Sequence, residues 1–339
     1  MNSSLNPTFR ISVVIPTHNR AGLVQKALQS VLAQTYPVHE ILVVDDGSTD
    51  GTREVVEGYS QSSASPKTPV RYTYQAQQGV AAARNRGVAN STGDWLAFLD
   101  SDDLWLPDKL DWQVRALTKY SGVSAACSTD SRYLNNIHLT KTAFQQIGAQ
   151  CDGQTGVFPE FAKRITAPIF HGVYLQALVV KADIVRSMGG FHSALTVNED
   201  TDFLFHLAQR TNICYVNIPL VEIDRTPRRE IGLTELRNNE SYRLEMAQYM
   251  YEKWLREYDG ADPEIRTGIR QRLRDIHIGW ASVQLLGGSN SAALQSLSLA
   301  LRYGFSKKAV AKWMSIRLAP ALTKRALLKR REKEPPPLL

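Results

Sequence analysis

Short apolar runs alternate with amphipathic stretches along the first two thirds of the chain. The runs at 11–15, 40–44 and 95–99 are almost wholly apolar, as expected for strands buried on both faces of a parallel sheet. Apolar residues recur between these runs at helical spacing. That spacing predicts helices over 23–32, 52–59, 80–88 and 107–119, with further strands over 70–74 and 125–127. Strands alternating with helices are typical of an α/β domain with right-handed crossovers.

The pattern changes twice further along the chain. Alternation predicts a strand over 173–179, and helices follow over 181–188 and 200–210, with a last short strand at 213–216. Long helical periodicities then run over 242–258, 265–286, 292–303 and 307–329. We therefore expect an α/β domain over 10–232, an all-helical region over 233–330, and disordered ends over 1–9 and 331–339.

Composition describes an ordinary globular protein. Of 339 residues, 43% are hydrophobic and 22% are charged. No apolar run reaches the ~18–20 residues of a membrane-spanning helix, and the first ten residues lack the apolar core of a secretory signal. Three cysteines lie far apart without a C-x-x-C pair, which argues against a disulfide framework or a zinc site. We expect a cytoplasmic protein with free thiols.

Positive charge is concentrated near the end of the chain. The net charge is +7, yet the segment from Arg302 to Glu334 alone holds eleven Lys or Arg and two Glu. Apolar residues are interleaved with these bases, which fits a helix lying on the inner, anionic face of a membrane better than a nucleic-acid site. A helix packed on the domain by its apolar side explains the pattern equally well. We expect no nucleic-acid partner.

Three carboxylates follow the strand at 95–99 within four residues: Asp100, Asp102 and Asp103. Clustered carboxylates repel one another, and a divalent cation such as Mg²⁺ or Mn²⁺ relieves this while sharing oxygen ligands with substrate phosphates. The alternative is an acidic turn that precedes the helix beginning near Pro107.

Polar residues also follow the other strands. Thr17, Asn19 and Arg20 come after the first strand, and Asp45 and Asp46 end the second. The carboxyl ends of parallel strands meet at one edge of a sheet, where ligands of open α/β folds bind. A mixture of acids and arginines at such an edge favours an anionic ligand carried on a metal, such as a nucleoside diphosphate.

Five motifs carry a resemblance to a known family. They are ISVVIPTHNR at 11–20, VVDDGSTD at 43–50, AARNRG at 82–87, DSDD at 100–103 and NEDTD at 198–202. In this order and spacing they resemble the family-two inverting glycosyltransferases over residues 10–225. The resemblance implies a GT-A fold, which is a mostly parallel nucleotide-sugar-binding sheet flanked by helices. The helical C-terminal appendage lies outside it.

The resemblance also implies roles for individual residues. Those expected to bind the nucleotide are Thr17, Asn19, Arg20, Asp45, Asp46, Arg84 and Asp100. Asp102 and Asp103 would hold Mn²⁺ or Mg²⁺, and Asp200 would be the catalytic base. The chemistry of transfer with inversion agrees with these roles. A metal stabilises the diphosphate leaving group, so one base is enough, and it takes the proton from the acceptor hydroxyl. The alternative is that Glu199 and Asp200 only begin a helix.

Contacts to the acceptor or the diphosphate are less defined. Trp105 follows the acids and either stacks on an acceptor sugar or belongs to the core. Many relatives carry an Arg or His on a loop after the last strand, whereas residues 223–234 here contain no histidine. Arg225 and Arg228 are the candidate diphosphate clamps instead, and Glu199 is a further candidate contact.

These features predict a metal-dependent inverting glycosyltransferase. It would move a sugar from a nucleotide-sugar donor, with UDP as the expected nucleotide, to a glycan or lipid-linked saccharide in polysaccharide or glycoconjugate assembly. A polyprenyl-phosphate acceptor and a non-catalytic sugar-binding module stay open as alternatives. The glycine-rich loops of dinucleotide-binding oxidoreductases and P-loop enzymes are absent from the sequence.

Overall fold

The computed structural model describes residues 9–61, 68–134, 141–146, 151, 153–167, 172–226 and 239–333. These residues form two compact units. The first holds the described residues up to 162 together with 172–226, and the second holds 163–167 and 239–333. The expected domain border at 232–233 lies outside the described residues. Phe9, expected within a disordered end, is buried, and its backbone N–H donates to the Tyr36 hydroxyl.

Nine strands of the described residues form one sheet in the first unit, in the order β3-β2-β1-β4-β8-β6-β9-β5, with β7 paired to β9. The strands are β1 (Ile11–Thr17), β2 (Glu40–Asp46), β3 (Val70–Gln75), β4 (Trp95–Phe98), β5 (Leu104–Trp105), β6 (Ser124–Leu134), β7 (Thr155–Val157), β8 (Leu178–Lys181) and β9 (Asn212–Asp224). The expected α/β class is therefore confirmed.

The sheet changes direction at β8. Strands β3, β2, β1 and β4 are all parallel, whereas β8 runs antiparallel to both β4 and β6. The pairing of Thr17 with Asp45 and of Asp46 with Gln75 aligns the ends of the first three strands. This alignment brings three polar loops to one edge of the sheet.

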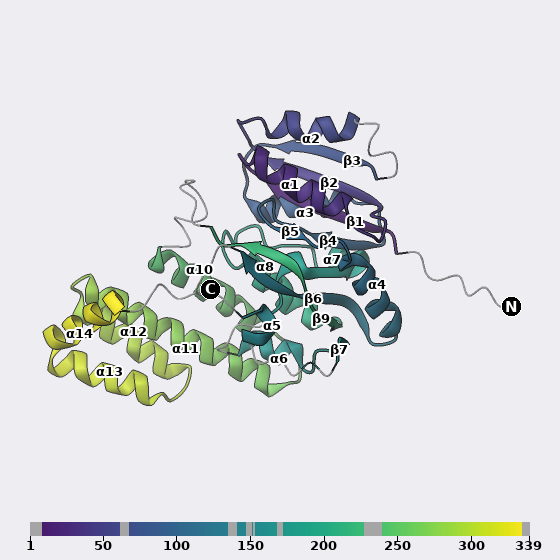
Figure 1. Cartoon of the computed structure of the whole chain (residues 1–339). Coiled ribbons are helices and arrows are strands. Elements are labelled where there is room, and N and C mark those ends of the chain that lie inside the picture. The colour runs from purple at the N-terminus through teal and green to yellow at the C-terminus, as the bar shows by residue number, and fades with distance from the viewer. Residues whose placement is uncertain are drawn as a thin grey trace. The chain divides into compact units, whose positions relative to one another are not determined.

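Helices cover both faces of the sheet (Figure 1). The helical elements of the described residues up to 226 are α1 (Ala21–Leu32), α2 (Thr52–Gln61), α3 (Val80–Asn90), α4 (Lys109–Lys119), α5 (Ala143–Gln146), α6 (Phe161–Thr166), the 3₁₀ turn η1 (Leu175–Ala177), α7 (Ala182–Ser187) and α8 (Glu199–Ala208). Helix α6 spans the border between the units.

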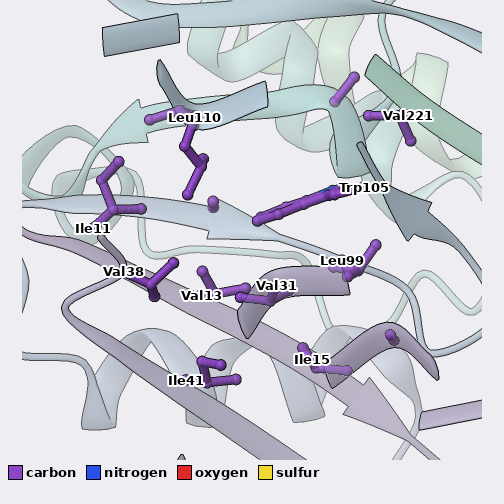
Figure 2. Packing of buried hydrophobic residues seen from close by; sticks show 14 of the residues in the cluster. Ile11, Val13, Ile15, Val31, Val38, Ile41, Leu99, Trp105, Leu110 and Val221 are labelled. Atoms are coloured by element: carbon purple, nitrogen blue, oxygen red, sulfur yellow. The ribbon is translucent and has the colours of Figure 1, made fainter. Parts of the chain in front are cut away.

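The main hydrophobic core lies between the sheet and helices α1, α2 and α4. Ile11, Val13 and Ile15 point to this side because side chains alternate along a strand. Figure 2 shows them facing Val31 and Leu110. On the other face, Phe98 makes edge-to-face contacts with Phe191, which precedes α8, and with Phe203 of α8.

Helix α3 packs tightly on that second face. A Cβ atom added at Gly87 would lie 2.3 Å from a methyl carbon of Val14. Any larger residue at this position would therefore push the helix away from β1. This close approach fixes the distance between the sheet and Arg84, which lies one turn earlier on α3.

The second unit is helical, as expected. Its helices are α10 (Glu240–Glu257), α11 (Pro263–Leu286), α12 (Asn290–Arg302), α13 (Lys307–Leu318) and α14 (Pro320–Lys333). Side chains of Asp262, Ser289 and Ser306 cap α11, α12 and α13. A core that includes Leu285 and Leu297 joins α11, α12 and α13, and Leu327 of α14 packs against it.

Several expected elements differ in extent. The single helix expected over 307–329 is two helices, because Pro320 lacks the N–H that would continue α13. Strands β6 and β9 are far longer than the expected three or four residues. The strand expected over 173–179 begins as the turn η1. Among the described helices, none is long and apolar enough to cross a membrane.

Candidate functional site

The loop after β1 is held against the loop after β2. Asn19 adopts a left-handed backbone conformation with φ of 51°. Its backbone N–H donates to the Ser48 hydroxyl at 2.7 Å, and its side-chain oxygen accepts from the Thr49 N–H at 2.7 Å. The structure therefore gives Asn19, expected to bind a nucleotide, a loop-bridging role. Thr17, at the end of β1, is buried.

Asp45 and Asp46 are both buried and anchored at the end of β2. Asp45 accepts from the Ser48 N–H at 2.8 Å and from the Tyr72 hydroxyl at 2.6 Å. Burial, together with this carboxylate, raises the pKa of Tyr72 and keeps its proton on the phenol.

Asp46 receives three hydrogen bonds from the segment between β3 and α3. The Gln75 side chain and the Gln78 N–H donate to one carboxylate oxygen, and the Gly79 N–H donates to the other, each at 2.8 Å. Asp46 thus ties the segment between β3 and α3 to the edge where the first three strands end.

The three acids after β4 have different environments. Asp102 pairs with Arg20 at 3.0 Å, and about a fifth of its side chain is exposed. Asp103 is 3% exposed and accepts from the Gln176 side chain at 2.6 Å and from the Asp224 N–H at 2.9 Å. Burial, reinforced by Asp102 and Asp100, raises the pKa of Asp103 well above its ordinary value. Both Asp103 oxygens accept hydrogen bonds from the protein, and its role as a metal ligand stays a prediction.

A buried arginine joins the acids after β4 to helix α8. The Arg84 guanidinium donates at 2.7 Å to Asp100 and at 2.7 Å to Glu199. Arg84 and Glu199 are 3% and 1% exposed. Burial opposes the charge, but the two carboxylates more than compensate and raise the pKa of Arg84. These two residues bridge the loop after β4 and helix α8, and their expected contacts with the ligand stay predictions.

This bridge places Asp200 near the same edge. Asn198 precedes α8 in a left-handed conformation, with φ of 66°. Glu199, held by Arg84, is the first residue of α8, and Asp200 is the second. Asp200 is half-buried, and one of its oxygens accepts from the Thr201 N–H at 2.7 Å. Negative charge in the first turn of a helix is favoured by the helix dipole.

Arg225 lies at the end of β9 beside two tyrosines. Its guanidinium is 5.7 Å from the ring centre of Tyr174 and 5.9 Å from that of Tyr133. The two phenol oxygens are 3.0 Å apart. Burial raises the pKa of Tyr174, and the charges of Arg225 and Asp200 also act on it, so this group lies within electrostatic range of Asp200. Arg228, the other expected clamp, lies outside the described residues.

Trp105 is buried in the main hydrophobic core, and its expected contact with an acceptor sugar stays a prediction. It is 3% exposed and lies among the apolar side chains of Figure 2. Its indole N–H donates to the Gln176 carbonyl at 2.9 Å, and the Lys109 ammonium lies 3.9 Å from its ring centre. Burial lowers the pKa of Lys109 to about 7.

The donor groups available for a metal are few. Within the described residues, no group of three or more His, Cys, Asp or Glu side chains lies close enough to hold an ion. Asp102 and Asp100 keep partly exposed side chains. This arrangement fits a divalent cation whose remaining ligands come from a bound diphosphate and water.

Gln176, Tyr133 and Tyr174 were not expected from the sequence. Tyr133 lies in a segment, 130–134, where hydrophobic periodicity is weak, and Tyr174 and Gln176 are the polar positions of the alternation at 173–179. A Gln and two Tyr carry no motif by themselves, so only the folded chain shows that they surround Asp103 and Arg225.

Comparison with known proteins agrees with this geometry. Residues 12–166 match the family model of glycosyl transferase family 2. The uncharacterized glycosyltransferase YibD of Escherichia coli (strain K12) is 29% identical over 210 residues, which cover 60% of this chain and 58% of that protein. The chain spans less than two thirds of the length of the curated relatives it matches.

Solved structures share the fold. The crystal structure of Staphylococcus aureus TarS 1–349 with UDP-GlcNAc has a TM-score of 0.67 at 15% identity, covering 96% of this chain and 92% of that one. The mannosyltransferase PcManGT of Pyrobaculum calidifontis with GDP-Man and Mn²⁺ has a TM-score of 0.57 at 21% identity, covering 97% and 89%. The fold is of the GT-A type. Residues 12–166 are thus similar in sequence to glycosyl transferase family 2, and the whole chain is similar in fold to these solved structures.

Proposed function

We propose that this chain is a metal-dependent inverting glycosyltransferase that uses a nucleotide-sugar donor. The observation that carries the proposal is the buried bridge from Asp100 through Arg84 to Glu199. It ties the loop that carries Asp102 to the start of the helix that carries Asp200. Asp102, which is suited to bind a cation, and Asp200, which is suited to accept a proton, would thereby be held at one edge of the sheet.

The donor's nucleotide would occupy the edge formed by the ends of β1, β2 and β3. Asp46 offers a buried carboxylate there, and Arg20 offers a guanidinium next to Asp102. We propose a UDP-sugar as the donor. The TarS structure contains UDP-GlcNAc and the PcManGT structure contains GDP-Man, so related folds accept either nucleotide.

Asp102 would hold Mn²⁺ or Mg²⁺, and the cation would neutralise charge on the diphosphate as it leaves. Arg20 shares the Asp102 carboxylate and would bind diphosphate oxygens at the same time. Arg225 is a second candidate to bind the diphosphate, although in the structure its guanidinium contacts Tyr133 and Tyr174.

Asp200 would act as the general base. Its position in the first turn of α8 favours the ionised form, which is the form that accepts a proton from an acceptor hydroxyl. Attack by that hydroxyl from the face opposite the diphosphate inverts the anomeric carbon. A single base suffices, because a diphosphate leaves without needing a proton.

The acceptor in this proposal is a glycan or a lipid-linked saccharide. A polyprenyl-phosphate acceptor is the nearest enzymatic alternative, and a peripheral contact of the basic C-terminal helices with a membrane would suit either lipid-borne substrate. A non-catalytic sugar-binding module would bind donor without turning it over.

Donor binding tests the nucleotide and metal parts of the proposal. We expect isothermal titration with UDP-GlcNAc, UDP-glucose and GDP-mannose to show binding of at least one donor that Mn²⁺ strengthens. Asp102→Ala should weaken that binding by roughly tenfold or more, about 1.4 kcal/mol. Asp94→Ala is the matched control, because Asp94 is exposed just before β4, at its opposite end. Equal affinities for the two variants would contradict the assignment of Asp102.

A further inference from the structure

Exposed large apolar side chains are concentrated in and just before the last two described helices. Eight such side chains are exposed among the described residues, and five of them lie between 305 and 328. The five are Phe305, Met314, Leu318, Leu322 and Leu328. Leu318 is 82% exposed and Leu322 is 68% exposed. Single exposed apolar residues are ordinary, but a group of them in one segment marks an interaction surface.

Helix α13 has two distinct faces. Ala309 and Ile316 are buried in the core of the helical unit. Lys307, Met314 and Leu318 are exposed, and their seven- and four-residue spacing puts them on one helix face, away from that core. The exposed face therefore combines apolar side chains with a positive charge.

Helix α14 continues the same chemistry after Pro320. Leu327 packs partly against the core of the unit. Leu322, Arg325 and Lys329 are exposed, at three- and four-residue spacing, and so share one face. Figure 1 shows α13 and α14, in yellow, as neighbouring helices, and they contact each other.

Charge in this region has one sign. From Ile276 to Arg331 the sequence contains ten Lys or Arg and no Asp or Glu. Lys312 is turned inward, and its ammonium donates to the Ser282 hydroxyl and the Ile278 carbonyl. Burial, together with the charges of Lys308 and Arg330, lowers the pKa of Lys312 to about 8. Helices α13 and α14 together contain ten Lys or Arg and one acid, Glu332, so positive charge predominates in both.

We propose that the exposed faces of α13 and α14 form a docking surface for an anionic lipid bilayer. We define this docking surface as Lys307, Met314, Leu318, Leu322, Arg325 and Lys329. Its apolar side chains would enter the boundary between headgroups and acyl chains, and its bases would contact lipid phosphates. The inference concerns the helical unit alone and does not rest on the proposed transfer reaction.

A bilayer fits this surface better than a nucleic acid does. Protein surfaces that bind single-stranded nucleic acid combine Lys and Arg with aromatic side chains, on which the nucleobases stack. The docking surface presents Leu and Met instead, which gain nothing from base stacking but gain free energy on leaving water. Both ligands supply phosphates, so the apolar side chains are what distinguish them.

Co-sedimentation of the full chain with vesicles tests the proposal. We expect binding to phosphatidylcholine vesicles with one quarter phosphatidylglycerol, and at least tenfold weaker binding to pure phosphatidylcholine. Leu318→Ser with Leu322→Ser should weaken binding to the anionic vesicles by roughly tenfold or more. Arg325→Glu with Lys329→Glu should do the same and should reduce the dependence on salt.

Matched controls separate the docking surface from general effects. Val123→Ser removes an exposed apolar side chain of the first unit, and Lys26→Glu with Arg86→Glu makes the same change in net charge there. These controls should bind vesicles like the unchanged chain, and all variants should keep its melting temperature. The proposal is overturned by equal binding to both kinds of vesicle, by no binding, or by equal losses in the controls. A single-stranded RNA that binds with an affinity unaffected by Leu318→Ser and Leu322→Ser would also overturn it.

Discussion

At the scale of single residues, Arg84 joins two parts of the candidate site that are distant in the sequence. An arginine has two terminal nitrogens on one rigid plane, so it can hold two carboxylates in a fixed relation. Here one carboxylate follows β4 and the other begins α8. The sequence motif around Arg84 predicts contact with a ligand, and in the structure the buried guanidinium joins Asp100 to Glu199.

Replacing Arg84 should therefore cost stability. Arg84→Gln leaves Glu199 buried without its cation, and breaking a buried pair in this way costs about 3–5 kcal/mol. Arg84→Lys should recover part of the loss, because it restores the charge but not the two-pronged geometry. Urea unfolding of the purified chain measures both changes.

Arg86→Gln is the matched control for Arg84, since Arg86 is exposed two positions further along α3. It should change the free energy of unfolding by less than about 0.5 kcal/mol. If Arg84→Gln has as small an effect as Arg86→Gln, the bridge does not hold α8 in place.

At the scale of elements, the alignment of strand ends depends on contacts at the opposite edge of the sheet. Glu40, the first residue of β2, accepts from Ser12 of β1 at 2.8 Å and from the Thr92 N–H before β4 at 2.6 Å. Its other oxygen accepts from Arg71 of β3 at 3.0 Å. One buried carboxylate thus joins the beginnings of four adjacent strands, which sets where those strands end.

The protonation of Glu40 makes this contact sensitive to pH. Burial alone would raise the pKa of Glu40, but hydrogen bonds from Thr92, Ser12 and Arg71 outweigh it and lower the pKa from 4.5 to about 2. The unfolded chain therefore binds the proton more tightly. The stabilising contribution is full above about pH 4.5 and is lost as pH falls toward 2.

Glu40→Gln should destabilise the protein by about 2–3 kcal/mol at pH 7, and the difference from the unchanged chain should shrink between pH 4.5 and 2. Chemical unfolding at a series of pH values measures this. Glu57→Gln, at an exposed helical pair, is the control and should show almost no effect. A Glu40→Gln deficit that stays constant down to pH 2 would argue against the assigned pKa.

For the whole molecule, the sequence predicts the strands β1, β2 and β4 well because each is an unbroken apolar run. It also predicts that polar loops follow them, because parallel strands end at one edge. It does not predict β8 beside β4, since antiparallel insertion depends on contacts between distant segments. For the same reason it could not show that Trp105, Asp103 and Glu199 are buried.

In the helical unit, too, the sequence predicts some features and does not predict others. Periodicity and caps locate α10, α11 and α12, and Pro320 explains the break that the longer pattern conceals. Which apolar residues of α13 stay exposed depends on where Ile316 and Ala309 pack. Exposure of Leu318 and Leu322 is thus a property of the folded unit, and periodicity alone does not reveal it.

The central claim is that Asp102 and Asp200, 98 positions apart in the sequence, serve one reaction at one edge of the sheet. The most direct test is release of nucleoside diphosphate from UDP-, dTDP- and GDP-sugars by the full chain with Mn²⁺. We expect Asp200→Asn to lower kcat by roughly 10²–10⁴-fold while the donor still binds with unchanged affinity. Asp183→Asn, at an exposed position on α7, should leave turnover unchanged. Turnover by Asp200→Asn at the rate of the unchanged chain would contradict the account.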